Sequence, residues 1–313
     1  MRRFWQSRTI VARALWPFSQ IYRVTASLDR WLATARKASV PVIAIGNVTA
    51  GGAGKTPTTI ALAKLLGDQT PHILTRGYGA NITAPIRVNP AQHLAEQVGD
   101  EALLLAAAAP AWAFRRRSAS AEAAIAAGAK LLLCDDALQH HPLHRDINLL
   151  VLDGEYGVGN GWCLPAGPLR EPLHQALLRC HAVILIGEDR HQLTAPVSLP
   201  VFHARIMPAE DTAWLKNTRL LAFAGIARPK KFYDFLRAQG AEIVATQDFP
   251  DHHSFAEKEL ERLAAPGLPL VTTEKDWVRL RPLWRQRVRA VPVQLQFDAP
   301  EKLREWILHA LSR

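Results

Sequence analysis

The chain has 313 residues, of which 49% are hydrophobic and 21% charged, and its formal net charge is +10. This composition supports a packed core and excludes global disorder, and the length allows about two domains of ordinary size. No uninterrupted apolar run approaches the ~18 residues of a membrane-spanning helix. The three cysteines form no C-x-x-C pair, which excludes a zinc ribbon and a disulfide framework and favours a reducing cytosol.

The positive charge is concentrated at the N-terminus. Residues 1–37 hold eight basic side chains and one acidic side chain, a net of +7. Apolar residues recur at three- and four-residue spacing over 10–32, which predicts an amphipathic helix that Pro17 kinks or restarts. Tryptophan, which prefers the headgroup zone of a bilayer, occurs three times in or just before this helix: at Trp5, Trp16 and Trp31. We expect residues 1–35 to lie on an anionic membrane surface; the alternative is a helix packed on the protein with a solvated basic face.

A buried strand is predicted at 41–45 and a helix after residue 57, with a glycine-rich loop between them. The expected ATP-binding residues of this loop are Thr49, Ala50, Gly51, Gly52, Ala53, Gly54, Lys55 and Thr56. The order strand, loop, helix is that of a phosphate-binding loop, in which backbone N–H groups and the helix N-terminus cradle phosphates. Lys55 is expected to reach the β- and γ-phosphates and Thr56 to bind Mg²⁺. Thr49 replaces the first glycine of the usual pattern.

A second apolar strand is predicted at 130–134, and it ends at Asp135 and Asp136. An acidic residue at this place holds Mg²⁺ or its water in phosphate-loop proteins, although Asp is also common in ordinary strand-end turns. Three histidines follow, at His140, His141 and His144. They could form a transition-metal site, but no further ligand spacing supports one, so His140 is interpreted as a hydrogen-bonding group near the nucleotide.

Further candidates lie between these two strands. Arg76 follows a predicted strand at 71–74, so it is expected at the same sheet edge as the phosphate loop. Asp100 precedes a helical run at 102–109 and is either its N-cap or a carboxylate that faces the phosphate site. The basic run 115–117 is either a solvated patch or a phosphate contact.

The second half alternates strands and helices, which predicts α/β layers. The strand-like runs are 147–152, 182–186, 219–224, 242–245, 268–273 and 288–297. The helical runs are 172–179, 229–239, 256–264 and 300–312. We predict a nucleotide-binding domain over 36–150 and a second α/β domain over 151–313, whose final helix, 300–313, can pack back on the first domain.

The ordered set of motifs resembles the tetraacyldisaccharide 4'-kinase family across nearly the whole chain. The residues that carry this resemblance are Gly46-Asn47, Gly51 to Pro57, Arg76-Gly77-Tyr78, Gly99-Asp100-Glu101, Asp135-Asp136, Gln139-His140, Leu164 to Gly167, Leu169 to Pro172, Phe249 to His252 and Thr272 to Asp276. The chain departs from the family pattern at Ala137, where glycine is usual, and at Ala102, where proline is frequent.

The resemblance implies two α/β/α sandwich domains that face each other across a cleft and are joined by a short two-stranded linker. The first is a parallel sheet of the phosphate-loop NTPase type. The family uses ATP and Mg²⁺ to phosphorylate the 4'-hydroxyl of a tetraacyldisaccharide 1-phosphate, forming lipid IVA in lipid A biosynthesis. It works on the cytoplasmic face of the bacterial inner membrane as a peripheral or monotopic protein, so anionic lipids are expected partners and nucleic acid is not.

The resemblance also implies residue roles. Asp100 and His252 are the expected catalytic pair that activates the sugar hydroxyl. The expected magnesium ligands are Thr56, Glu101, Asp135 and Asp136. The expected contacts to substrate or phosphate are Arg76, Arg117, Arg170 and His140, with Arg116 as the neighbour that competes with Arg117 for this role.

An ATPase that acts as a partner-binding switch is the alternative function. Such proteins often carry a lysine before the two glycines of the loop, where this chain has Ala50, and the guanine-reading N-K-x-D pattern is absent from the sequence. A nucleic-acid-dependent ATPase is disfavoured because the positive charge is confined to the N-terminal segment.

Overall fold

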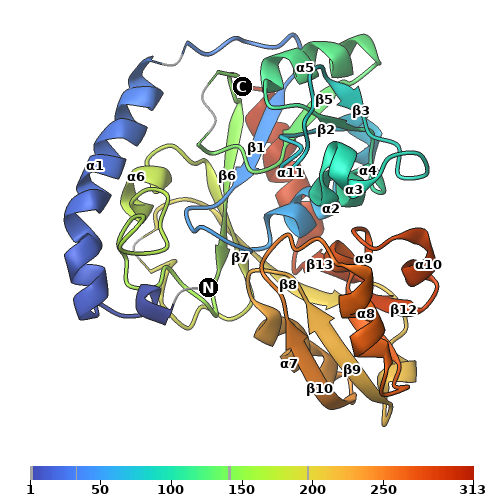
Figure 1. Ribbon diagram of the computed structural model, residues 1–313. Helices are drawn as coiled ribbons and strands as arrows, with labels where there is room; N and C mark the ends of the chain where they lie inside the picture. The colour runs from blue at the N-terminus through green and yellow to red at the C-terminus, as the bar shows by residue number, and fades with distance from the viewer. Residues whose placement is uncertain (1–2, 33, 140–141, 196) are drawn as a thin grey trace.

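The computed structural model describes residues 3–32, 34–139, 142–195 and 197–313. Their strands form a nine-stranded sheet in the order β13-β8-β7-β6-β1-β5-β2-β4-β3 and a four-stranded sheet in the order β10-β9-β11-β12. Figure 1 shows the small sheet beside the large one, with the N-terminal helix α1 (Ile10–Leu32) along the opposite edge of the molecule.

The large sheet is parallel from β4 to β8, and antiparallel strands pair at both of its edges. Its strands are β1 (Val42–Gly46), β2 (Pro71–Thr75), β3 (Ile86–Arg87), β4 (Ala111–Ala113), β5 (Leu131–Cys134), β6 (Ile147–Asp153), β7 (Ala182–Ile186), β8 (Val201–Pro208) and β13 (Val293–Phe297). Every residue of β1, β2, β5, β6 and β7 is buried, as expected for parallel strands that are covered on both faces.

Helices cover both faces of this sheet. Successive residues of β1 point to opposite faces, so Ile43 and Ile45 join one apolar cluster while Val42 and Ala44 join another. The helices around the large sheet are α2 (Lys55–Leu65), α3 (Ala95–Val98), α4 (Asp100–Ala106), α5 (Arg117–Ala126), α6 (Leu173–Leu177) and α11 (Pro300–Leu311). Residues of α2, α4 and α11 pack with Ile43, and α5 packs on the other face, so the layers are α/β/α.

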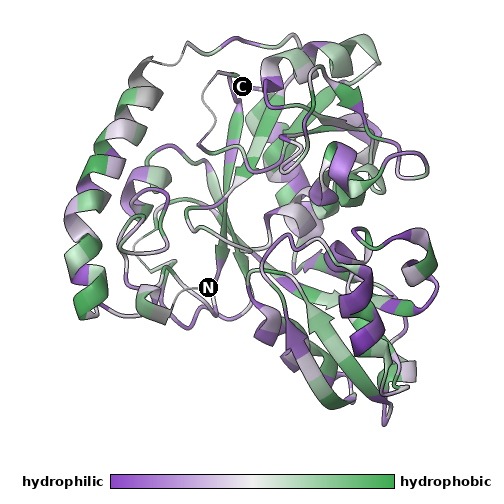
Figure 2. Cartoon of the chain, viewed as in Figure 1, coloured by the Kyte–Doolittle hydropathy of each residue, from purple (hydrophilic) through white to green (hydrophobic). Residues whose placement is uncertain are grey.

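The small sheet is entirely parallel and has its own two clusters. Its strands are β9 (Arg219–Ala224), β10 (Glu242–Asp248), β11 (Leu270–Thr273) and β12 (Val288–Val291), and its helices are α7 (Pro229–Ala238), α8 (Glu257–Ala264), α9 (Glu274–Trp277) and α10 (Pro282–Arg285). Short 3₁₀ helices complete the described elements: Arg3–Trp5, Gly67–Gln69 and Ala213–Leu215. Figure 2 shows hydrophobic residues along the strands of both sheets and hydrophilic residues on α8.

The pairing of the strands suggests a different domain boundary from the one that the sequence predicts. The expected boundary between residues 150 and 151 falls inside β6, which continues to Asp153 in the large sheet. The chain leaves that sheet through β8, a strand that the sequence analysis missed, and returns through β13. The run 288–297 is two strands in two sheets, because Pro292, which has no N–H to donate, ends β12. We therefore propose that the second domain comprises residues 209–292, with β8 and β13 as the linking strands.

The N-terminal helix has the predicted bounds, and it continues through Pro17 as a single helix. A narrow face with Ala12 and Ser19 is buried, and the Ser19 hydroxyl donates to the Cys163 carbonyl at 2.8 Å. Large apolar side chains on the rest of α1 are exposed: Ile10, Val11, Trp16, Phe18, Ile21, Val24 and Leu28. Within the described part of the chain, no helix is both long and apolar enough to span a membrane.

Candidate active site

A cleft of about 1770 Å³ lies between the two domains, where the carboxyl ends of both parallel sheets face each other. The large sheet contributes the phosphate loop after β1, Arg76 after β2 and the aspartates after β5. The small sheet contributes the β9–α7 loop, His252 after β10 and Lys275 in α9. Ligands of α/β proteins bind at such strand ends, so the location agrees with the sequence prediction.

The phosphate loop has the backbone that its glycines permit. Gly54 has φ +85°, and a Cβ atom there would lie 2.4 Å from Ile186 Cδ1, so only glycine fits. Helix α2 begins at the next residue, Lys55, whose Nζ lies 3.2 Å from Asn47 Oδ1 and 3.7 Å from Asp136 Oδ1. Residues 51–56 line the cleft, as a cradle for phosphates must.

The first two predicted ATP-binding residues are engaged elsewhere. Thr49 is buried, and its hydroxyl accepts a hydrogen bond from the Asn47 amide at 2.9 Å. The Ala50 N–H donates to the Pro168 carbonyl at 2.7 Å. Neither residue lines the cleft. The geometry therefore favours phosphate binding from Gly51 onward, with Thr49 and Ala50 as the anchor of the loop on residues 168–169.

Asp135 is buried beside the start of α2. Its carboxylate accepts from the Thr59 hydroxyl at 2.7 Å, and the Thr56 hydroxyl is 3.4 Å away. Burial, followed by the negative charge of Glu101, raises the pKa of Asp135 to about 7. Among the described residues, no group of three His, Cys, Asp or Glu side chains suited to a metal occurs.

Asp136 is paired with cations. Arg170 donates to both of its oxygens, at 2.8 and 3.0 Å. Burial alone would raise the pKa of Asp136, but Lys55 and Arg170 lower it to about 2. The positive φ of this turn falls on Asp136, at +47°, while Ala137 is not among the residues with positive φ. Alanine in place of the family's usual glycine therefore carries no backbone strain here.

The predicted phosphate contacts divide into two groups. Arg117 is 3% exposed and its Nη2 donates to the carbonyls of Asp135 and Asp136, so the geometry favours a role in holding their backbone. Arg76 and Arg116 are exposed and line the cleft, and Arg117 and Arg170 line it as well. His140 lies outside the described residues, as does His141, so their predicted roles stay predictions.

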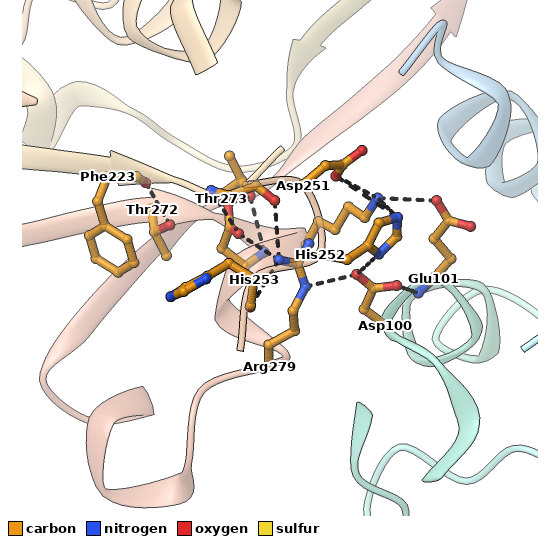
Figure 3. Close-up of polar contacts among 12 residues, drawn as sticks. Asp100, Glu101, Phe223, Asp251, His252, His253, Thr272, Thr273 and Arg279 are labelled. Carbon is orange, nitrogen blue, oxygen red and sulfur yellow. Dashed lines mark hydrogen bonds and ion pairs between the residues drawn. The ribbon is translucent and has the colours of Figure 1, made fainter. Parts of the chain in front are cut away.

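Asp100 and His252 meet across the cleft. Asp100 is the first residue of α4, whose N-cap is Gly99, so the N-cap interpretation of Asp100 is wrong. Its Oδ2 is 2.9 Å from His252 Nδ1, and its Oδ1 accepts from the Glu101 N–H at 2.8 Å. Figure 3 shows Asp100 and Glu101 facing His252 and Asp251. Burial opposes ionisation of Asp100, but His252, Lys275 and Arg279 together hold its pKa well below its ordinary value.

Two basic residues of this cluster have no role in the sequence analysis. The Nε of Arg279 donates to Asp100 Oδ2 at 2.8 Å, while its Nη1 donates to the carbonyl of Gly225 at 3.1 Å. The Nζ of Lys275 is 3.2 Å from Glu101 Oε1. Lys275 belongs to the motif 272–276, which the sequence analysis singled out without a function. Nothing in the sequence marked Arg279, because Asp100, Gly225 and His253, to which it donates, come from three distant segments.

A second contact joins the domains at the other side of the phosphate loop. Arg228, the N-cap of α7, binds the Gly52 carbonyl and the buried carboxylate of Asp153. Lys231 also donates to Asp153, at 3.1 Å. Charged side chains therefore link the two domains at two places beside the cleft.

Comparison with known proteins gives one consistent result. The family model described as tetraacyldisaccharide-1-P 4'-kinase matches residues 11–312. A tetraacyldisaccharide 4'-kinase of Gluconobacter oxydans is 44% identical over 98% of both chains, and one of Rhodospirillum centenum is 48% identical over 92% of this chain and 89% of the relative. The solved structure of an LpxK from Aquifex aeolicus in complex with ATP is similar with a TM-score of 0.78 and 27% identity, covering 96% of this chain and all of that one.

Proposed function

The chain belongs to the tetraacyldisaccharide-1-P 4'-kinase family, and we propose that it transfers the γ-phosphate of ATP to the 4'-hydroxyl of a tetraacyldisaccharide 1-phosphate, with the cross-domain pair Asp100–His252 at the reacting centre. The observation that carries this assignment is that the phosphate loop and His252 line one cleft, with Asp100 buried directly behind His252 at 2.9 Å. Phosphoryl transfer needs positioned groups and charge stabilisation, which the two facing domains supply.

The residues present fit ATP with Mg²⁺. Thr56 and Asp135 offer a hydroxyl and a carboxylate beside the loop, which is the hard oxygen set that Mg²⁺ binds. Mg²⁺ usually takes only one or two protein ligands and completes its shell with phosphates and water. We therefore assign Thr56 and Asp135 as its ligands, with Glu101 near them, while Asp136 holds Arg170 and Lys55. When bound, the ion would neutralise charge on the β- and γ-phosphates.

The proposed chemical step uses Asp100 as the base. Its carboxylate takes the proton of the 4'-hydroxyl as that oxygen bonds to the γ-phosphorus. The bond from the γ-phosphorus to the bridging oxygen breaks, and ADP leaves with the electron pair. His252 and Arg279 orient the carboxylate, since both donate to its Oδ2. Lys55 lies where it can stabilise charge on the transferred group.

The acceptor is expected to approach from the α1 side. A groove of about 820 Å³ lies between α1 and residues 158–178, with apolar side chains such as Trp16, Leu173 and Leu177 along it. Such a groove suits acyl chains. Arg76 and Arg116, exposed at the cleft, suit the phosphate of the acceptor.

We propose further that α1 attaches the protein to the cytoplasmic face of the inner membrane. Phe18, Ile21 and Val24 are between 58% and 62% exposed, which is unusual for apolar side chains of a helix that packs on its own protein. The net charge of +7 over 1–37 favours anionic lipids. An attached helix keeps the active site close to a substrate whose acyl chains lie in the bilayer.

The decisive experiment measures transfer of labelled γ-phosphate to acylated disaccharide 1-phosphate in detergent micelles. The expected result is one labelled phosphate per acceptor, which requires both Lys55 and Asp100. The matched control is an acceptor that already carries a 4'-phosphate, which must remain unlabelled. ATP hydrolysis that continues at the same rate without acceptor would contradict the proposal and favour the partner-binding switch.

A further inference from the structure

Lys275 lines the cleft and contacts a histidine ring as well as two carboxylates. Its Nζ lies 3.2 Å from Glu101 Oε1 and 3.6 Å from Asp251 Oδ1, and also 3.3 Å from Nε2 of His252. The ammonium thus contacts one ring nitrogen of the imidazole, Nε2, while Asp100 contacts the other, Nδ1. Its side chain is only 21% exposed, so water competes little for these contacts.

The partners of His252 determine which ring nitrogen carries hydrogen. An ammonium has three N–H donors and no acceptor, so Nε2 can only accept from Lys275. At Nδ1 the partner is Asp100 Oδ2, which already accepts from Arg279, while Oδ1 accepts from the Glu101 N–H. A carboxylate in such surroundings is an acceptor. Both contacts are therefore satisfied together only by a neutral ring with hydrogen on Nδ1.

We propose that Lys275 is a positioning residue that keeps Nε2 of His252 free of hydrogen, so that the neutral ring donates through Nδ1 to Asp100. The proposal rests on the assigned function of Asp100 as the base and deepens it. A neutral imidazole orients the carboxylate without placing a full positive charge against it. An imidazolium would oppose the proton transfer, because it stabilises the ionised carboxylate more strongly.

The groups around the ring support this role. The alternative hydrogen position on Nε2 would face the ammonium, and the nearest carboxylate, Asp251, is 3.9 Å from that nitrogen, beyond a hydrogen bond. Tyr78 packs against the ring with 5.0 Å between centroids and leaves both nitrogens to their polar partners. Figure 3 shows the ring of His252 between Asp100 and Asp251. Without the ammonium, Nε2 would lose the donor from which it accepts, and Asp251 would be the acceptor that faces a hydrogen on this nitrogen.

The test is nitrogen-15 NMR of the imidazole side chains of the full-length protein in detergent at neutral pH, with His252→Gln to assign the signal. The wild type is expected to show hydrogen on Nδ1 and none on Nε2. In Lys275→Met, Nε2 should become protonated, and kcat should fall about tenfold to a hundredfold, the loss typical when a group that orients an active-site ligand is removed. The KM for ATP should change little.

Lys275→Arg keeps a donor without an acceptor, so it should keep Nε2 unprotonated and recover most of kcat. Lys258→Met is the matched control, because Lys258 is an exposed lysine of α8 and does not line the cleft. A protonated Nε2 in the wild type would overturn the proposal, whether or not Lys275→Met folds. If folded Lys275→Met still had no hydrogen on Nε2 of His252, the proposal would be overturned too. Failure of the base assignment is separate: full single-turnover transfer by Asp100→Asn would refute that assignment while the NMR result stands.

Discussion

Asp100 and His252 are 152 positions apart in the chain and belong to different domains, yet Asp100 Oδ2 and His252 Nδ1 lie 2.9 Å apart. Neither domain can build this pair alone. The proposed catalytic pair therefore forms only where the two domains meet, and variants of the pair should affect chemistry more than nucleotide binding.

Asp100→Ala is expected to slow the chemical step about 10²- to 10⁴-fold, as loss of a general base does. Single-turnover transfer measures this step, and ATP affinity should change little. The loss of rate in His252→Ala should be smaller than in Asp100→Ala. The loss in the double variant should be far smaller than the product of the two single losses, because the two residues act as a unit. Collapse of ATP affinity with intact single-turnover chemistry would instead make Asp100 a structural residue.

Lys55→Ala should lower turnover at least about 10²-fold, by analogy with the loss of one preorganised charge-stabilising donor. The side chain points into the cleft beside Asn47 and Asp136, so the variant should unfold at nearly the wild-type temperature. Turnover and thermal unfolding are measured on the same preparation. Wild-type turnover would rule out the phosphate-loop assignment.

Membrane attachment is tested with vesicles that contain anionic lipid. Deleting residues 1–32 should release the protein from vesicles, and high salt should weaken attachment of the intact chain because screening reduces the electrostatic attraction. Deletion also removes the buried contacts of Ser19, so Phe18→Ser with Ile21→Ser is the sharper variant. It should lower vesicle binding and raise the apparent KM for the lipid acceptor while ATP binding persists.

The control for that experiment is Leu283→Ser, which removes another exposed apolar side chain, 61% accessible and located in α10 of the small domain. It should bind vesicles as the wild type does. Undiminished sedimentation of the double variant at high salt would mean that another surface carries the attachment.

The free energy of unfolding should depend on pH through the ionisation of Asp153. Burial alone would raise the pKa of Asp153, but Arg228 and Lys231 hold it below its ordinary value. A lowered pKa in the folded protein gives stability that is complete above the unfolded pKa, about 3.9, and is lost as pH falls toward the folded pKa. Wild type should thus be more stable than Asp153→Asn at pH 7, and the difference should shrink below about pH 4.

Urea unfolding at pH 7, 4 and 3 measures this difference. Arg228→Gln should reproduce part of it, since Lys231 remains beside the carboxylate. A stability difference that grows on acidification would contradict the assignment of the ion pair.

The sequence alone predicted the elements whose pattern is local. The phosphate loop is recognisable because Gly54, Lys55 and Thr56 stand between a β-branched strand and an apolar helix, an order that is typical of phosphate-binding loops. The bounds of α1 followed from apolar spacing in the same way. The family resemblance supplied Asp100 and His252, whereas periodicity could not relate two residues so far apart.

Tertiary structure decided what depends on partners from distant segments. It showed that β6, β7 and β8 continue the large sheet beyond residue 150, which strand pairing alone reveals and on which the proposed domain boundary rests. It turned Arg117 toward the backbone of Asp135 and brought Lys275 and Arg279 into contact with His252 and Asp100. The local sequence around a charged residue is the same whether water or a carboxylate surrounds its side chain in the folded protein. Its role is set by burial and by the charges within a few ångströms, which the fold alone assembles.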